Sequence, residues 1–233
     1  MDGWHTALKP AYEPIILARK PLRGTVARNV QTFGTGALNV DGCRVGGGPR
    51  PLVVSDRRGG NVVFSEGLQG SRLAGETTAG RWPANVLLDE AAAAVLDAQS
   101  GESVSRQGAP RSSSKPGDGY GMTHTGAEYD DRGGASRFFY TSKASGKDRG
   151  REEHGNDHPT VKPTDLMRWL CRLVTPPGGL ILDPFMGSGS TGVAAVAEGF
   201  RFVGVDIEQH HVDIADSRLR SAARQPDLLR VAS

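Results

Sequence analysis

The feature that most constrains this chain is a glycine-rich loop, Asp183-Pro184-Phe185-Met186-Gly187-Ser188-Gly189-Ser190-Thr191-Gly192, between two short apolar segments. Residues 179–183 before it and 202–206 after it are typical of buried strands. Residues 191–198 between them predict a small-residue helix that Gly199 ends. Two strands joined through a helix form a parallel pair, so the pattern predicts an α/β fold.

The loop fits the spacing G-x-G-x-x-G through Gly187, Gly189 and Gly192, and the next strand ends at Asp206. Glycines allow a tight turn and close approach of the backbone to a ligand, and a carboxylate at that strand end can hold both ribose hydroxyls. Three interpretations stay open: a structural turn without ligand, an NAD site and an S-adenosylmethionine site. An NAD domain needs more strands than the single helix expected after Asp206, so its strands would have to lie upstream, in a permuted order.

Two further motifs flank the loop. His158-Pro159-Thr160-Val161-Lys162-Pro163 precedes it, and Gly204-Val205-Asp206 follows it. With Asp183-Pro184-Phe185 and the glycines, they appear in the order seen in the permuted, β-class DNA amino-methyltransferases, which make N6-methyladenine or N4-methylcytosine. Residues 156–220 resemble that family, and residues 8–21, 34–39 and 80–85 resemble its bacterial and phage members more weakly.

The resemblance implies a cofactor and a set of cofactor-binding residues. The cofactor would be S-adenosylmethionine, and Asp206 would hold its ribose hydroxyls. Thr160 and Lys162 would lie near its methionine part, and His158 is either a site residue or a loop histidine packed before a helix. Four more residues would line the methionine and ribose side: Asp183, Phe185, Gly187 and Gly189.

The family's catalytic motif is an Asp, Asn or Ser followed by two prolines and an aromatic residue, and it positions the amino group of a flipped base. The only Pro-Pro pair, in Thr175-Pro176-Pro177-Gly178, has neither the acid nor the aromatic residue. No catalytic residue is therefore assigned, and we expect the chain to begin after the catalytic segment. The expected function is transfer of a methyl group to adenine N6, in preference to cytosine N4. The alternative is a catalytically silent DNA- or cofactor-binding fragment that needs a companion chain carrying the motif.

The resemblance also implies a domain plan, with a Rossmann-like methyltransferase sheet, incomplete in this chain, and a long loop-rich recognition insertion. Residues 1–20 would end the catalytic half with a strand at Glu13–Arg19, 21–157 would recognise double-stranded DNA, and 158–233 would bind the cofactor. Within this plan we predict a strand within 80–88, a helix capped by Asp89, a loop over 99–135, a strand over 137–141, and helices over 164–174 and 209–224. The basic residues expected to contact phosphates are Lys20, Arg23, Arg28, Arg106, Arg111, Lys115, Arg132, Arg137, Lys143, Lys147, Arg149 and Arg151.

Composition excludes several other classes of protein. The 233 residues carry a formal net charge of +2 and two cysteines, Cys43 and Cys171, too few for a disulfide framework or a cysteine zinc site. No apolar run approaches the length of a membrane span, and the N-terminus lacks a signal-peptide pattern. A reducing cytoplasm is the expected compartment. His210, His211 and Asp213 are poor joint metal ligands, because adjacent helical side chains point in different directions.

Overall fold

The computed structural model describes residues 12–55, 71–105, 131–142, 148 and 155–224. The chain divides into two compact units, Met1–Ala37 and Leu38–Ser233, and each is described by itself. The domain boundaries expected from the sequence, after residues 20 and 157, stay predictions. Among the described residues, no helix has both the length and the apolar character needed to cross a bilayer.

The first unit contains one described helix, α1 (Val26–Phe33), which the sequence analysis did not predict. The Thr25 hydroxyl caps it by accepting a hydrogen bond from the Arg28 N–H, and Gly34 ends it in a left-handed conformation. The strand predicted at Glu13–Arg19 is wrong, because this segment has no strand structure and Ile16 is 88% exposed. A strand forms a ladder of hydrogen bonds with a neighbouring strand, and none of the described strands forms such a ladder with this segment.

Among its described residues, the second unit begins with short elements that include three two-stranded sheets. Helix α2 (Glu90–Ser100) starts where predicted, with the Asp89 carboxylate accepting a hydrogen bond from the Ala92 N–H. The other elements of this region are the 3-10 helices η1 (Asp41–Cys43) and η2 (Ala135–Phe138) and the strands β1 (Arg50–Ser55), β2 (Ser71–Thr77), β3 (Leu87–Asp89), β4 (Ser103–Val104), β5 (Arg132–Gly133) and β6 (Tyr140–Ser142). Strand β1 pairs antiparallel with β2, β4 antiparallel with β5, and β3 parallel with β6.

Several expectations for this region need correction. The strand predicted within 80–88 is confined to β3, and the one predicted over 137–141 is η2 followed by β6. Arg137 is not free for phosphates, because its guanidinium donates to the carbonyl groups of Gly133 and Gly134. Most of the loop predicted over 99–135 and seven of the expected phosphate contacts lie outside the described residues, namely Arg106, Arg111, Lys115, Lys143, Lys147, Arg149 and Arg151.

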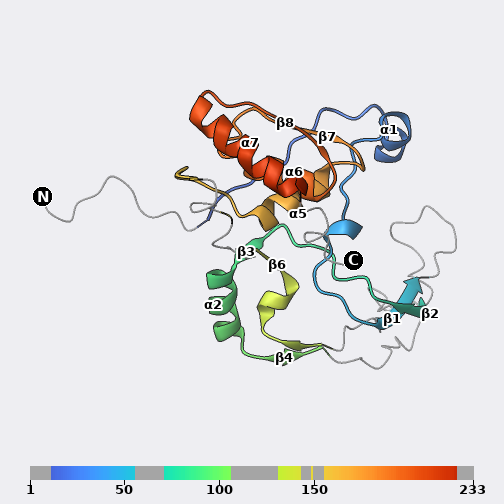
Figure 1. The fold of residues 1–233 in the computed structure, drawn as a ribbon. Helices are drawn as coiled ribbons and strands as arrows, with labels where there is room; N and C mark the ends of the chain where they lie inside the picture. The colour runs from blue at the N-terminus through green and yellow to red at the C-terminus, as the bar shows by residue number, and fades with distance from the viewer. Residues whose placement is uncertain (1–11, 56–70, 106–130, 143–147, 149–154, 225–233) are drawn as a thin grey trace, which may run out of the picture. The chain divides into compact units, whose positions relative to one another are not determined.

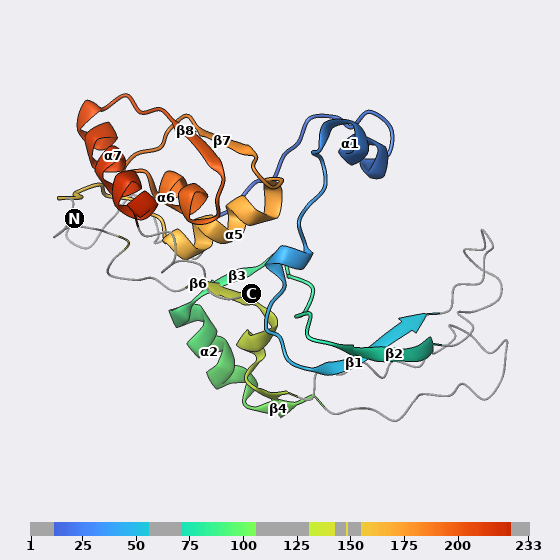
Figure 2. The same cartoon turned by 45° about the vertical axis from the view of Figure 1, so that its right-hand side comes forward.

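The last part of the chain forms the predicted strand–helix–strand unit. Strands β7 (Leu180–Asp183) and β8 (Arg201–Gly204) are parallel and are joined through α6 (Ser190–Ala197). Helices α5 (Thr164–Val174) and α7 (Gln209–Arg224) have the predicted boundaries. Figures 1 and 2 show α5, α6 and α7 gathered along one side of the two strands. The core of this part lies between these helices and the strands and includes Ala194, Ala195, Ile214 and Ala215.

The opposite face of this strand pair is bare. Leu182 and Val203 are paired neighbours on that face and are 62% and 46% exposed. Leu180 and Arg201, the next pair, are also exposed. The expectation of buried strands is therefore wrong for this face, and on the helix-covered face the strand residues Ile181 and Phe202 are half-buried. Parallel sheets are normally covered on both faces, so this apolar surface is unusual.

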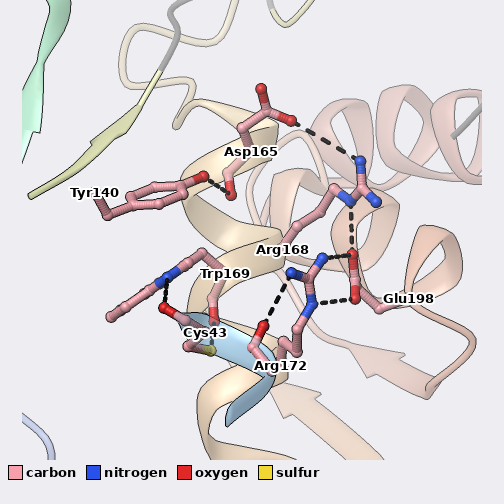
Figure 3. Close-up of polar contacts among 8 residues, drawn as sticks. Cys43, Tyr140, Asp165, Arg168, Trp169, Arg172 and Glu198 are labelled. Carbon is pink, nitrogen blue, oxygen red and sulfur yellow. Dashed lines mark hydrogen bonds and ion pairs between the residues drawn. The ribbon is translucent and has the colours of Figure 1, made fainter. Parts of the chain in front are cut away.

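A charged cluster fastens α5 to the end of α6 (Figure 3). The Glu198 carboxylate accepts hydrogen bonds from the guanidinium groups of Arg168 and Arg172 at 2.7–2.8 Å. Burial by itself raises the pKa of Glu198, but the hydrogen bonds from Arg172 and Arg168 outweigh burial and hold the pKa below its ordinary value. On the same helix, the Trp169 indole N–H donates to the Cys43 carbonyl, which fixes η1 against α5.

We predict that Glu198→Gln lowers the free energy of unfolding by roughly 2 kcal/mol at pH 7, because it weakens charged hydrogen bonds in a nearly buried cluster. The stabilisation is present above the unfolded-state pKa of about 4.3 and is lost as the pH falls through the lower folded-state pKa. Urea unfolding at pH 7 and below pH 4 measures the difference. Glu102→Gln, in an exposed pair with Arg132, is the control and should cost only a few tenths of a kcal/mol. Equal effects of the two substitutions would contradict this account.

Candidate functional site

The glycine-rich loop leaves β7 in a tight turn and enters α6. The Asp183 carboxylate accepts a hydrogen bond from the Phe185 N–H, which starts the turn. Gly187 and Gly189 both have positive φ angles, 50° and 80°, and Gly189 is the N-cap of α6. A side chain at Gly189 would meet Ala215 of α7, because its Cβ would lie 2.8 Å from the Ala215 Cβ. Glycine is therefore required by conformation and by packing.

Asp206 lies just after β8 and joins the loop to that strand end. Its Oδ2 accepts a hydrogen bond from the Gly187 N–H at 2.8 Å, and its Oδ1 accepts one from the Glu208 N–H at 3.0 Å. These two backbone donors, Glu208 first and then Gly187, hold the pKa of Asp206 below its ordinary value. A carboxylate has about four acceptor positions, so about two remain beyond these backbone donors for the neighbouring His211 or for a ligand's hydroxyl groups.

Two histidines pack beside this carboxylate. His211 Nδ1 lies 3.5 Å from Asp206 Oδ1. The rings of His158 and His211 pack edge to face, with their centroids 4.6 Å apart. His158 also backs the loop, because a Cβ added to Gly187 would come within 2.7 Å of its Nε2. Burial first, and then the neighbouring His211, lower the pKa of His158, so the neutral ring is favoured. The structure thus places His158 against the loop.

The remaining predicted residues are spread around this centre. The Thr160 N–H donates to His158 Nδ1, so Thr160 lies one contact from the loop, and its side chain is exposed. Phe185 follows the first turn and is 88% exposed. Lys162 is half-buried in the segment that leads to α5. Asp183, Gly187, Gly189, Asp206 and His158 therefore form the compact part of the site.

The sequence analysis missed two buried residues that hold the loop through hydrogen bonds to Ser188. Asn156 is 1% exposed and its side-chain amide donates to the Ser188 hydroxyl at 3.3 Å. Arg218 of α7 is 5% exposed and donates to the Ser188 carbonyl at 2.5 Å. Arg218 interrupts the apolar stripe Ile214, Ala215, Leu219 and Ala222, and a charge in such a stripe was the available signal. Asn156 carries no comparable signal.

The arrangement can bind a ligand that has vicinal hydroxyl groups. It combines a carboxylate at a strand end with a close-approaching glycine backbone and the N-terminus of α6. It offers no nucleophile–base pair among the residues just described. Within the described ranges, no group of three or more His, Cys, Asp or Glu side chains could hold a metal ion.

Comparison with known proteins gives a consistent set of similarities. A family model described as "DNA methylase" matches residues 66–217. The type II methyltransferase M.HinfI of Haemophilus influenzae is 36% identical over 93 residues, 40% of this chain and 26% of that protein. M2.DpnII of Streptococcus pneumoniae is 44% identical over 70 residues, 30% of this chain and 26% of that protein. The chain thus spans about a quarter of the length of these relatives. Among solved structures, an M1.HpyAVI–SAM complex is similar at 33% identity and a TM-score of 0.30, covering 35% of this chain and 39% of that one.

We predict that Gly189→Ala lowers the free energy of unfolding by about 2–4 kcal/mol, because it adds overpacking against α7 to the strain of a positive φ. Gly199→Ala is the matched control, with φ of 78° and nothing within 4 Å of the added Cβ. It should cost about 1–2 kcal/mol from strain alone. Urea unfolding of both variants measures the difference. Equal losses would show that close packing does not constrain the loop.

Proposed function

The chain belongs to the DNA methylase family, and from this membership we propose that it serves methyl transfer from S-adenosylmethionine to an exocyclic amino group of a flipped DNA base. The observation that carries the proposal is the Asp206 carboxylate held against the Gly187 N–H at the end of β8. Adenine N6 is the favoured target over cytosine N4, on the family resemblance. We place the reaction in the cytoplasm, consistent with two free, buried cysteines.

The residues present fit S-adenosylmethionine. The remaining acceptor positions of Asp206 suit the ribose hydroxyls, and Gly187 and Gly189 let the backbone approach the cofactor without a side chain between them. Asp183 and the exposed Phe185 would line the methionine and ribose side, with His158, Thr160 and Lys162 near the methionine part. When bound, the cofactor supplies a methyl group on a positively charged sulfur. This chain's own residues bind and orient that group.

The target amino group needs hydrogen-bond acceptors that position it, and we assign no such residue in this chain. We therefore propose that a companion polypeptide supplies the catalytic motif. One observation supports this proposal. Within the described residues, the parallel pair β7 and β8 leaves the apolar side chains Leu180, Leu182 and Val203 exposed on one face, whereas parallel sheets are normally covered on both faces. A companion with further strands and a covering helix would complete this sheet.

The alternative function is a silent fragment that binds the cofactor or DNA without catalysis. Double-stranded DNA is the proposed substrate in both cases. Among the described basic residues, Lys20, Arg23 and Arg28 are exposed and suit phosphate contact, whereas Arg132 is paired with Glu102. The two functions share the cofactor site and differ only in methyl transfer. An NAD-dependent reaction would instead show as binding of NAD in place of S-adenosylmethionine.

The test is transfer of radiolabelled methyl groups from S-adenosylmethionine to unmethylated bacterial DNA, followed by nucleoside digestion and chromatography. We expect cofactor binding by this chain and no label from this chain alone. Label in N6-methyladenine or N4-methylcytosine from this chain alone would overturn the proposal of a companion polypeptide and would identify the target base. Absence of S-adenosylmethionine binding would overturn the proposed function itself.

We predict that Asp206→Asn weakens S-adenosylmethionine binding by about tenfold or more, because it removes a charged acceptor for the ribose hydroxyls. Isothermal titration calorimetry of the full chain measures the affinity. Asp216→Asn, which changes an exposed carboxylate on α7 paired with Arg220, is the control and should bind as the unchanged chain does. Unchanged affinity of Asp206→Asn would show that the ribose lies elsewhere.

A further inference from the structure

A buried guanidinium lies under the glycine-rich loop. Arg218 extends from α7 and is 5% exposed. Its Nη1 donates to the Ser188 carbonyl at 2.5 Å and the Ser188 hydroxyl at 3.1 Å. The same nitrogen lies 3.5 Å from the Ser190 hydroxyl in the first turn of α6.

The same side chain joins three segments that are far apart in the sequence. While Nη1 holds the loop and the start of α6, Nη2 donates to the Asp148 carbonyl at 2.9 Å. Asn156, close after Asp148, donates to the Ser188 hydroxyl as well. Figure 2 shows α7, which carries Arg218, alongside α6. Ser188 stands between the two positive-φ glycines, so its carbonyl direction sets the path of the whole loop.

The chemistry of this contact is unusual for a purely structural residue. Among the described residues, Arg218 forms no ion pair, and its hydrogen-bond acceptors are carbonyl and hydroxyl oxygens. Burial lowers its pKa, although a guanidinium stays charged in proteins. Burying a charge is costly, and apolar side chains of similar volume often stabilise such positions as well or better. A charge retained here therefore acts on what it holds, which is the loop.

We propose that Arg218 is a positioning residue that presets the glycine-rich loop for S-adenosylmethionine. This inference rests on the proposed function and extends it to a residue that does not touch the cofactor. The planar guanidinium fork is needed because two of its nitrogens hold separate segments at once, which a single ammonium group cannot do. The Asp206 carboxylate holds the Gly187 N–H at the end of β8, and Arg218 of α7 holds the Ser188 carbonyl.

The test compares Arg218→Met and Arg218→Lys with the matched control Arg220→Ala on the same helix. Arg220 is 69% exposed and pairs with Asp216. Backbone hydrogen exchange of residues 186–190, in the chain without cofactor, reports the loop directly. Calorimetry with S-adenosylmethionine reports affinity, and thermal unfolding reports global stability.

For Arg218→Met we expect about tenfold faster exchange confined to residues 186–190 and about tenfold weaker binding. Arg218→Lys should recover only part of both losses, and Arg220→Ala should match the unchanged chain. A merely structural role would instead lower the unfolding temperature and speed exchange along all of α7. That result, or unchanged exchange in Arg218→Met, would overturn the proposal.

Two further outcomes are failure of Arg218→Met to fold and failure of the unchanged chain to bind S-adenosylmethionine. If Arg218→Met does not fold, Arg218→Lys decides, and loop exchange equal to that of the unchanged chain overturns the proposal. If the unchanged chain and Arg220→Ala both fail to bind S-adenosylmethionine, the proposed function fails. In that case the proposal that Arg218 positions the loop for this cofactor also fails. Backbone hydrogen exchange of residues 186–190 still shows whether Arg218 fixes the loop.

Discussion

The hydrogen bond from the Gly187 N–H to the Asp206 carboxylate brings the two strand ends of the C-terminal unit together. It requires glycine at two positions of the loop, because Gly187 and Gly189 lie against His158 and Ala215. It also requires β7 and β8 to be parallel, so that both strands deliver their carboxyl ends to the same edge. The packing of α6 and α7 beneath the loop follows from this closure.

The sequence predicted this unit well because its contacts are local. The boundaries of α5 and α7, the parallel pairing, and the position of Asp206 all follow from short-range periodicity and turn residues. The strand prediction for Glu13–Arg19 was wrong for the opposite reason. An apolar run indicates a strand, but it does not show whether another strand pairs with it. Arg218 was missed because its role depends on contacts with Ser188 and Asp148, which are distant in sequence.

The loop also lies between two opposite charges that have different partners. Asp206 accepts hydrogen bonds from the Gly187 and Glu208 N–H groups, and its side chain is 12% exposed. Arg218 is 5% exposed and donates to the carbonyl groups of Ser188 and Asp148. The two charges therefore hold different backbone groups of the loop and form no salt bridge with each other.

The bare face of β7 and β8 has a consequence for the behaviour of the chain by itself. Among the described residues β7 pairs with β8 alone, so its other edge keeps unpaired N–H and C=O groups beside exposed leucines. Unprotected edges of this kind are templates for pairing with any other extended chain, including copies of the same protein. This exposed apolar face and the edge beside it are thus also a nucleus for aggregation.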